Sequence, residues 1–112
     1  VAIIPADLSA PIPELEATID QVLTAASQVI GGGEGRADGC LDYVVLNAGV
    51  GQLRPSSLTK HDITEQIFQL NTLAPIALTQ ILLERGALRE DRGRHLVITS
   101  SVAAKMGVPL SA

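Results

Sequence analysis

The fold is decided by the stretch LDYVVLNAGVG at residues 41–51. Its first six residues form a nearly continuous apolar run, which is typical of a parallel strand that is covered on both faces. The small and polar residues that follow predict the loop in which this strand ends. Two further short apolar runs, Val1–Ile4 and His95–Thr99, predict one buried strand before it and one after it along the chain.

The segments between these strands repeat apolar residues at steps of three and four, which predicts two amphipathic helices. The first begins at Pro11–Pro13, because proline is tolerated in a first helical turn, and ends at Gly31–Gly33. The second is capped by Thr59 and ends near Arg89. The tail Val102–Ala112 is predicted to be a loop.

The order strand, helix, strand, helix, strand predicts an α/β fold with a parallel sheet and right-handed crossovers. Ligands bind such sheets beyond the carboxyl ends of the strands. Those ends place three groups of residues at one edge of the sheet: Asp7 and Leu8, then Asn47, Ala48 and Gly49, then Ser100 and Ser101.

The composition narrows the function classes. The chain has 112 residues, which is typical of one domain, and its apolar content of 46% excludes intrinsic disorder. One Phe and one Tyr provide no aromatic platform for bases, and a net charge of −4 gives no attraction to a nucleic-acid backbone. No ligand partner stands at metal-site spacing from His61, His95 or Cys40, so no metal is expected. No uncharged apolar run has the roughly 18 residues of a membrane-spanning helix.

The glycine-rich segment Gly31–Gly39 has two interpretations. Such a segment binds phosphate when it directly follows a strand and opens a helix. This one follows a helix and precedes a strand. It is therefore interpreted as a surface insertion rather than as a ligand loop.

The three strand ends, together with Asn71 in the second helix, resemble the short-chain dehydrogenase/reductase family. Asn47–Gly49 matches the family's Asn-Ala-Gly motif, and Val97–Ser101 is similar to its fifth strand with the catalytic serine. The motifs occur in the family's order over nearly all of the chain. The resemblance implies a fragment of a Rossmann-type, doubly wound parallel sheet, namely its third to fifth strands with two intervening helices. It also implies an NAD(P)-dependent oxidoreductase.

The resemblance assigns cofactor binding, with NAD or NADP as the cofactor, to the strand ends. Asp7 and Leu8 would contact its adenine, and Asn47–Gly49 and Ser100 would lie against it. Each assignment has an ordinary structural alternative. Asp7 with Ser9 is also a typical helix-entry cap, and Asn47–Gly49 is also a typical turn.

Asn71 is a polar residue within an apolar helical stripe, where it needs a partner. Pro75 stands four residues later and has no N–H, so the carbonyl of Asn71 lacks its usual helical donor. A freed carbonyl can hold a water, and the resemblance assigns that water to a catalytic proton relay. The alternative is a kink in which a neighbouring side chain satisfies the carbonyl.

Ser101 is the catalytic serine by resemblance. Its hydroxyl would donate a hydrogen bond to the substrate oxygen as that oxygen gains charge, which is an effective form of transition-state stabilisation. The alternative is a solvated loop serine, which is the commoner role of one member of a Ser-Ser pair.

The ends of the chain carry an expectation of their own. Val1 is the first residue and Met106 is the only methionine, which predicts a processed chain or a piece of a longer one. The family's glycine-rich phosphate loop, first two strands and catalytic Tyr and Lys have no counterpart in residues 1–112, and Lys105 is not a substitute. Residues 1–112 are therefore expected to be a partial NAD(P)-binding domain, truncated at both ends and inactive alone. This loss also leaves the choice between NAD and NADP open.

The complete protein is expected to transfer a hydride between a nicotinamide cofactor and a small carbonyl or alcohol substrate. The alternative is a non-catalytic nucleotide-binding or interaction module of the same fold. The helix Thr59–Arg89 resembles the one through which the family forms dimers, so a homo-oligomer is expected. The loop Lys105–Ala112 resembles the branch called dehydrogenase/reductase member seven, some of whose members are tethered to the endoplasmic reticulum membrane by a segment outside this region. An intracellular location follows, either cytoplasmic or at that membrane.

The family's strand order, 3-2-1-4-5, predicts which strands pair. Tyr43–Leu46 and Leu96–Thr99 are neighbours in that order and should pair in parallel. Val1–Ile4 belongs two places away, so it should be unpaired or collapsed onto the free edge of the strand Tyr43–Leu46.

Overall fold

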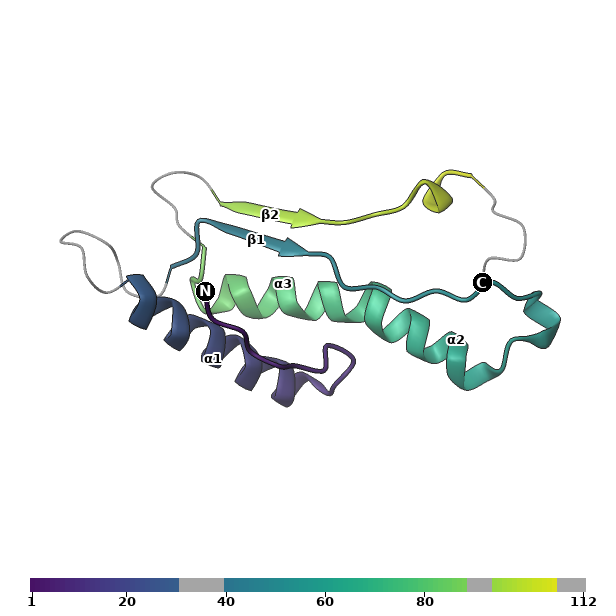
Figure 1. The fold of residues 1–112 in the computed structure, drawn as a ribbon, viewed down its shortest axis with the longest axis horizontal. Coiled ribbons are helices and arrows are strands. Elements are labelled where there is room, and N and C mark those ends of the chain that lie inside the picture. Colours follow the sequence, from purple (N-terminus) through teal and green to yellow (C-terminus); the bar gives the residue numbers. More distant parts are fainter. Residues whose placement is uncertain (31–39, 89–93, 107–112) are drawn as a thin grey trace.

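The computed structural model describes residues 1–30, 40–88 and 94–106 of the chain. The expectations about Gly31–Gly39, and most of those about the loop Lys105–Ala112, lie outside these residues. Helices and strands follow one another in the predicted α/β order, and Figure 1 shows α1 and α3 on the same side of the two strands. The main elements are α1 (Ile12–Ile30), β1 (Tyr43–Leu46), α2 (His61–Phe68), the π-helical segment η2 (Gln69–Leu73), α3 (Ala74–Glu84) and β2 (His95–Ile98), with short 3-10 turns η1 (Ser56–Leu58) and η3 (Val102–Ala104).

The sheet has two parallel strands. β1 and β2 pair in register from Tyr43 opposite His95 to Leu46 opposite Ile98, which confirms the predicted pairing. Val1–Ile4 forms no strand and is unpaired, as the strand order predicted. The expectation that this run is a buried strand is wrong, because Val1 and Ile3 are exposed. Without a neighbouring strand among the described residues, the run has no hydrogen-bonding ladder, and only Ile4 is half-buried, beside α1.

The core lies between the two helices and one face of the sheet. Leu15 and Ile19 of α1 pack with Leu78, Ile81 and Leu82 of α3. Side chains from the strands and from the N-terminal segment complete this core: Leu8, Val44, Leu46 and Leu96.

An ion pair joins the same two helices at the surface. Nε of Arg85, at the end of α3, lies 3.0 Å from Oδ1 of Asp20 in α1. The Asp20 carboxylate accepts this hydrogen bond and raises the pKa of the Arg85 guanidinium. Because both side chains are partly solvated, the pair adds little to stability, and the apolar contacts hold α1 against α3.

The opposite face of the sheet is open in the part of the chain that the structure describes. Tyr43, Val45 and Val97 point to this face and are each about half exposed or more. The rings of Tyr43 and His95 stack on it with their centroids 4.6 Å apart. The radius of gyration is 16.9 Å, whereas a compact domain of this length has about 13 Å. Within the described residues, the helices therefore cover one face of the sheet and leave the other face exposed.

The second helix is shorter than predicted. It begins at His61 and ends at Glu84. Thr59 does not cap it, because Thr59 ends the η1 turn and its hydroxyl donates to the carbonyl of Pro55. Two residues after this end stands Gly86, whose positive φ of 60° is a typical C-terminal signal. The predicted end at Arg89 lies outside the described residues.

The helix is interrupted by the π-helical segment η2. The N–H of Ala74 donates to the carbonyl of Gln69, five residues back, and the next residue, Pro75, has no N–H to donate. Figure 1 shows that α2 runs at an angle to α3, so the bend predicted near Asn71 is confirmed. Such π segments occur often at functional sites.

The continuous helix His61–Glu84 also has the length and composition of a membrane-spanning helix, with 24 residues and a mean hydropathy of 1.2. The expectation that no stretch reaches that length is therefore wrong for this helix. Its residues Leu78, Ile81 and Leu82 are buried against α1 and the sheet. These three side chains belong to the core, although only 22% of the apolar stretch of this helix is buried.

Candidate functional site

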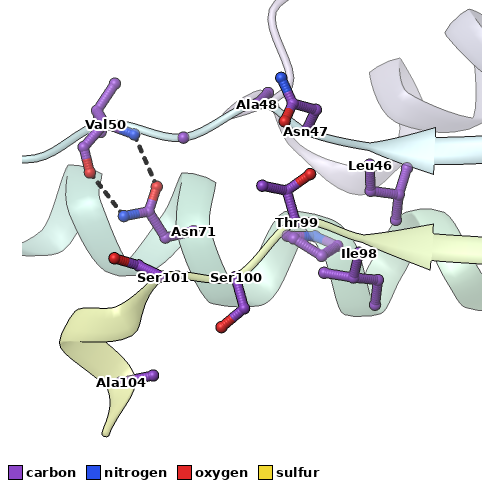
Figure 2. A pocket seen from close by; sticks show the side chains of 12 residues that line it. Leu46, Asn47, Ala48, Val50, Asn71, Ile98, Thr99, Ser100, Ser101 and Ala104 are labelled. Atoms are coloured by element: carbon purple, nitrogen blue, oxygen red, sulfur yellow. Dashed lines mark hydrogen bonds between the residues drawn. The ribbon is translucent and has the colours of Figure 1, made fainter. Parts of the chain in front are cut away.

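A pocket of about 370 Å³ lies beyond the carboxyl ends of β1 and β2 (Figure 2). It is the place where a parallel sheet of this kind binds ligands. Six of the eight predicted site residues line it: Asn47, Ala48, Gly49, Asn71, Ser100 and Ser101. The other two, Asp7 and Leu8, do not.

The side chain of Asn71 fixes the loop after β1. Its Oδ1 accepts the backbone N–H of Val50 at 2.9 Å, and its Nδ2 donates to the Val50 carbonyl at 2.6 Å. Figure 2 shows this pair of bonds spanning from the helix to the loop. The partner that a polar residue in this helix needs is therefore the loop backbone, and the pocket keeps its shape because both sides of it are tied together.

The side chain of Asn71 leaves little room for a side chain at position 49, where the chain has glycine. A Cβ atom at position 49 would come within 3.3 Å of Oδ1 of Asn71. That distance is tighter than most side chains tolerate, so a larger residue would push the amide away from Val50. The glycine of the Asn-Ala-Gly motif thus has a packing reason in this chain.

The backbone carbonyl of Asn71 lacks a donor four residues later, because Pro75 has no N–H. The residue lies in the middle of η2, where a backbone N–H donates five residues back, as that of Ala74 does to Gln69. Asn71 and Pro75 both line the pocket. The assignment of a relay water to this carbonyl stays a prediction.

Ser100 and Ser101 follow β2 closely, and their side chains point in different directions (Figure 2). Oγ of Ser101 accepts the N–H of Ala103 at 3.2 Å, so Ser101 caps the η3 turn. Among the described residues, those that line the pocket carry no charged side chain, neither carboxylate nor imidazole. These residues can orient a neutral group and donate hydrogen bonds to it.

Asp7 and Leu8 lie on the N-terminal segment, apart from this pocket. Oδ1 of Asp7 accepts the N–H and the hydroxyl of Ser9, at 2.9 Å and 2.6 Å. These two bonds hold the pKa of the exposed Asp7 carboxyl below its usual value. Leu8 packs against the core. The alternative interpretation, a helix-entry cap of Asp7 with Ser9, is thus confirmed in part, because the two residues form a turn before α1. The contact of Asp7 with adenine stays a prediction.

Sequence reasoning missed two groups that shape the site. Val50 supplies the backbone partner of Asn71, and Ala103 supplies the N–H that binds Ser101. Both act through the backbone, so their residue types gave no signal. Only their positions could have indicated these roles. Val50 directly follows Asn47–Gly49, and Ala103 stands two residues after a serine.

Comparison with known proteins adds independent findings. Dehydrogenase/reductase SDR family member 7B of Xenopus laevis is 29% identical over 91 residues, which cover 81% of this chain and 26% of the relative. The chain spans between 21% and 27% of the length of the curated relatives it matches. These relatives confirm the resemblance to the member seven branch.

Solved structures share the fold. A 3-oxoacyl-(acyl-carrier protein) reductase from Brucella melitensis is 26% identical, with a TM-score of 0.71 over 96% of this chain and 40% of that one. Angucycline C-6 ketoreductase LanV, solved with bound NADP, is 19% identical, with a TM-score of 0.77 over 93% of this chain and 36% of that one. The sequence profile of the short chain dehydrogenases matches residues 14–112. Because that match covers most of its length, the chain belongs to the short-chain dehydrogenase/reductase family.

Proposed function

We propose that residues 1–112 are the central part of an NAD(P)-dependent oxidoreductase that transfers a hydride between a nicotinamide cofactor and a carbonyl or alcohol substrate. The observation that carries this proposal is the pocket, which brings Asn47–Gly49, Asn71 and Ser100–Ser101 together at the carboxyl ends of two parallel strands. Family membership supports the class of reaction. Structures of similar fold were solved with NADP, with NAD and with NADH, which supports both forms of the cofactor.

The chemistry of the lining fits part of such a cofactor. Ala48, Gly49 and Ala104 leave room for a flat group, while the Asn47 amide and the Ser100 hydroxyl offer hydrogen bonds to a neutral one. We extend the proposal to the N-terminal segment, where the Asp7 carboxylate would accept a hydrogen bond from the adenine amine and the backbone N–H of Leu8 would bond to a ring nitrogen. When bound, the cofactor supplies the hydride or accepts it.

The residues of this chain would then act on the substrate oxygen and on the proton. The Ser101 hydroxyl would donate a hydrogen bond to that oxygen as it gains charge. The Asn71 carbonyl would hold a water of the proton relay, because Pro75 offers it no N–H from four residues on. The described residues of the lining include no acid or base, in keeping with the proposal that residues 1–112 alone are inactive and that the proton comes from the rest of the protein.

The test compares the full-length gene product with residues 1–112. Each is assayed with NADH and with NADPH against a panel of ketones and aldehydes. We expect turnover from the full-length protein only, and a loss of about a hundredfold in kcat for Ser101→Ala, as for removal of one oxyanion donor. Thr99→Ser, which keeps a hydroxyl in the same lining, is the control and should retain kcat within about twofold. No turnover from the full-length protein would contradict the oxidoreductase proposal, and turnover by residues 1–112 would contradict their inactivity.

We also propose that a second copy of the chain binds at a surface formed by α3 and Leu73, the residue that precedes it. Leu73, Ile76 and Leu83 follow one another at steps of three and seven residues and are each about half exposed. An apolar stripe of this kind marks an interaction surface. Ile76→Glu should turn a dimer of the full-length protein into a monomer in sedimentation velocity, whereas Gln66→Glu on α2 should not. A dimer that survives Ile76→Glu would move the interface elsewhere.

The proposed location is inside the cell, either in the cytoplasm or at the endoplasmic reticulum membrane through a segment outside residues 1–112. Relatedness to the member seven branch supports it. Fractionation of cells that express the tagged full-length protein tests it, since recovery in the culture medium would contradict an intracellular location.

A further inference from the structure

Ser101 is held by the turn that follows it. The residue is extended, with φ −134° and ψ 152°, and the η3 turn starts at the next residue. Two consecutive alanines donate to two different oxygens of this serine. The N–H of Ala103 donates to Oγ at 3.2 Å, and the N–H of Ala104 donates to the carbonyl oxygen at 3.0 Å.

The bond from Ala103 decides what the Ser101 hydroxyl can do. A hydroxyl has one proton and two lone pairs, whereas a backbone N–H can only donate. The bond therefore occupies a lone pair of Oγ, holds the side chain in one rotamer, and leaves the hydroxyl proton to point elsewhere. In the described parts of the chain, no acceptor takes that proton, and Ser101 lines the pocket.

The neighbouring serine lacks such a bond. Ser100 also lines the pocket, but the structure of the described residues gives its hydroxyl no hydrogen bond. Only one of two adjacent hydroxyls is thus oriented before a ligand arrives. Orientation in advance is what makes a hydrogen-bond donor effective toward developing charge, since it need not reorganise during the reaction.

We propose that the backbone N–H of Ala103 is a positioning group that keeps the Ser101 hydroxyl as a hydrogen-bond donor into the pocket. This role rests on the proposed function, in which Ser101 donates to the substrate oxygen. Ala103 acts through Ser101 and touches no substrate. Its side chain is irrelevant to the role, so only removal of the N–H tests it.

The turn offers a matched pair of variants for this test. In the full-length protein, lactic acid is incorporated in place of Ala103 or in place of Ala104, which exchanges one N–H for an ester oxygen and keeps the methyl side chain. The first variant loses the bond to Oγ of Ser101, and the second loses the bond to its carbonyl. Both lose one hydrogen bond of the same turn, so the second controls for damage to η3.

We expect the ester at 103 to lower kcat about fivefold, the ratio that corresponds to one ordinary hydrogen bond, with an unchanged KM for the cofactor. The ester at 104 controls for damage to η3, and because Ala104 lines the pocket, it is judged only by comparison: its effect on kcat should be the same with and without the Ser101 side chain. In a Ser101→Ala background, the ester at 103 should have no further effect. An undiminished effect of the ester at 103 in the Ser101→Ala background would overturn the positioning role while leaving the proposed function intact.

A second measurement does not depend on activity. In the full-length protein labelled with ¹⁵N-alanine, the amide proton of Ala103 should have a shallow temperature coefficient of its chemical shift, and Ser101→Ala should make it steeper. The amide of Ala104 should keep its coefficient. An unchanged Ala103 amide in Ser101→Ala would overturn the hydrogen bond itself. A wild-type protein without reductase activity would overturn the proposed function and this role with it.

Discussion

Asn71→Ala in the full-length protein removes both hydrogen bonds between the helix and the backbone of Val50. Each bond contributes about 1 kcal/mol to stability, so the two together contribute about 2 kcal/mol. Alanine is a better helix former than asparagine by about 0.6 kcal/mol, which offsets part of that loss. The expected fall in the free energy of unfolding is therefore about 1.5 kcal/mol.

The assay is urea unfolding followed by circular dichroism, with Thr72→Ala as the control. Thr72 is the exposed neighbour of Asn71, and its side chain makes no hydrogen bond within the described residues. Its replacement brings a similar gain in helix propensity without a loss, so it should be neutral or slightly stabilising. If Asn71→Ala and Thr72→Ala unfold at the same urea concentration, the two bonds contribute nothing and the reasoning is refuted.

Four further predictions use the same protein. Asn71→Leu should lower kcat more than it weakens cofactor binding, and equal losses would indicate misfolding rather than a relay role. Pro75→Ala restores an N–H that can reach the Asn71 carbonyl but leaves the extra residue of η2 in place, so a crystal structure of the variant should keep the π segment at 69–73; regular α-helix there would show that the proline alone maintains it. The depressed pKa of Asp7 means that its stabilising turn is complete above pH 3.8 and is lost as the pH falls below that value, so Asp7→Ala should lower Tm at neutral pH and leave it unchanged well below pH 3.8. Leu82→Ala, at a side chain only 1% exposed, should lower the free energy of unfolding by about 3 kcal/mol, and a loss under about 1 kcal/mol would mean that the site collapses around the smaller residue.

The elements that were predicted well are those whose pattern and packing agree. Of the apolar run at 41–46, Tyr43–Leu46 forms a strand, and the core covers its Val44 and Leu46 from one side. Leu78, Ile81 and Leu82 repeat at helical spacing and are all buried, as the periodicity requires. Val1–Ile4 has an equally good strand pattern but no partner, since pairing is a property of the neighbours and not of the run itself.

Boundaries were predicted less well, because local hydrogen bonds decide them. Thr59 has a good capping side chain, yet the η1 turn uses that residue and the helix starts two residues later. Gly86 ends the helix before the predicted end near Arg89, and it was overlooked because apolar residues continue after it. Pro75 predicted a missing helical hydrogen bond. That prediction did not distinguish a kink from a π segment, which contains one extra residue.

The candidate site was predictable where strand ends meet. Asn47–Gly49 and Ser100–Ser101 come together because β1 and β2 are adjacent and parallel. Asp7 follows a run that enters no sheet, so its distance from the pocket depends on strands that are not among the described elements. The bonds from the backbone of Val50 and Ala103 could not be predicted, since every residue type except proline supplies a backbone N–H.

The π segment also determines how this helix tolerates changes of length. A π turn contains one more residue than an α turn, so deleting a single residue within Gln69–Leu73 lets the segment close as ordinary α-helix while α2 and α3 keep their orientations. The same deletion at the start of α3 would rotate every later residue by about 100° about the helix axis. Such a rotation would turn Leu78, Ile81 and Leu82 away from the core that they form with α1. Single-residue insertions and deletions among homologues of this helix should therefore collect at 69–73.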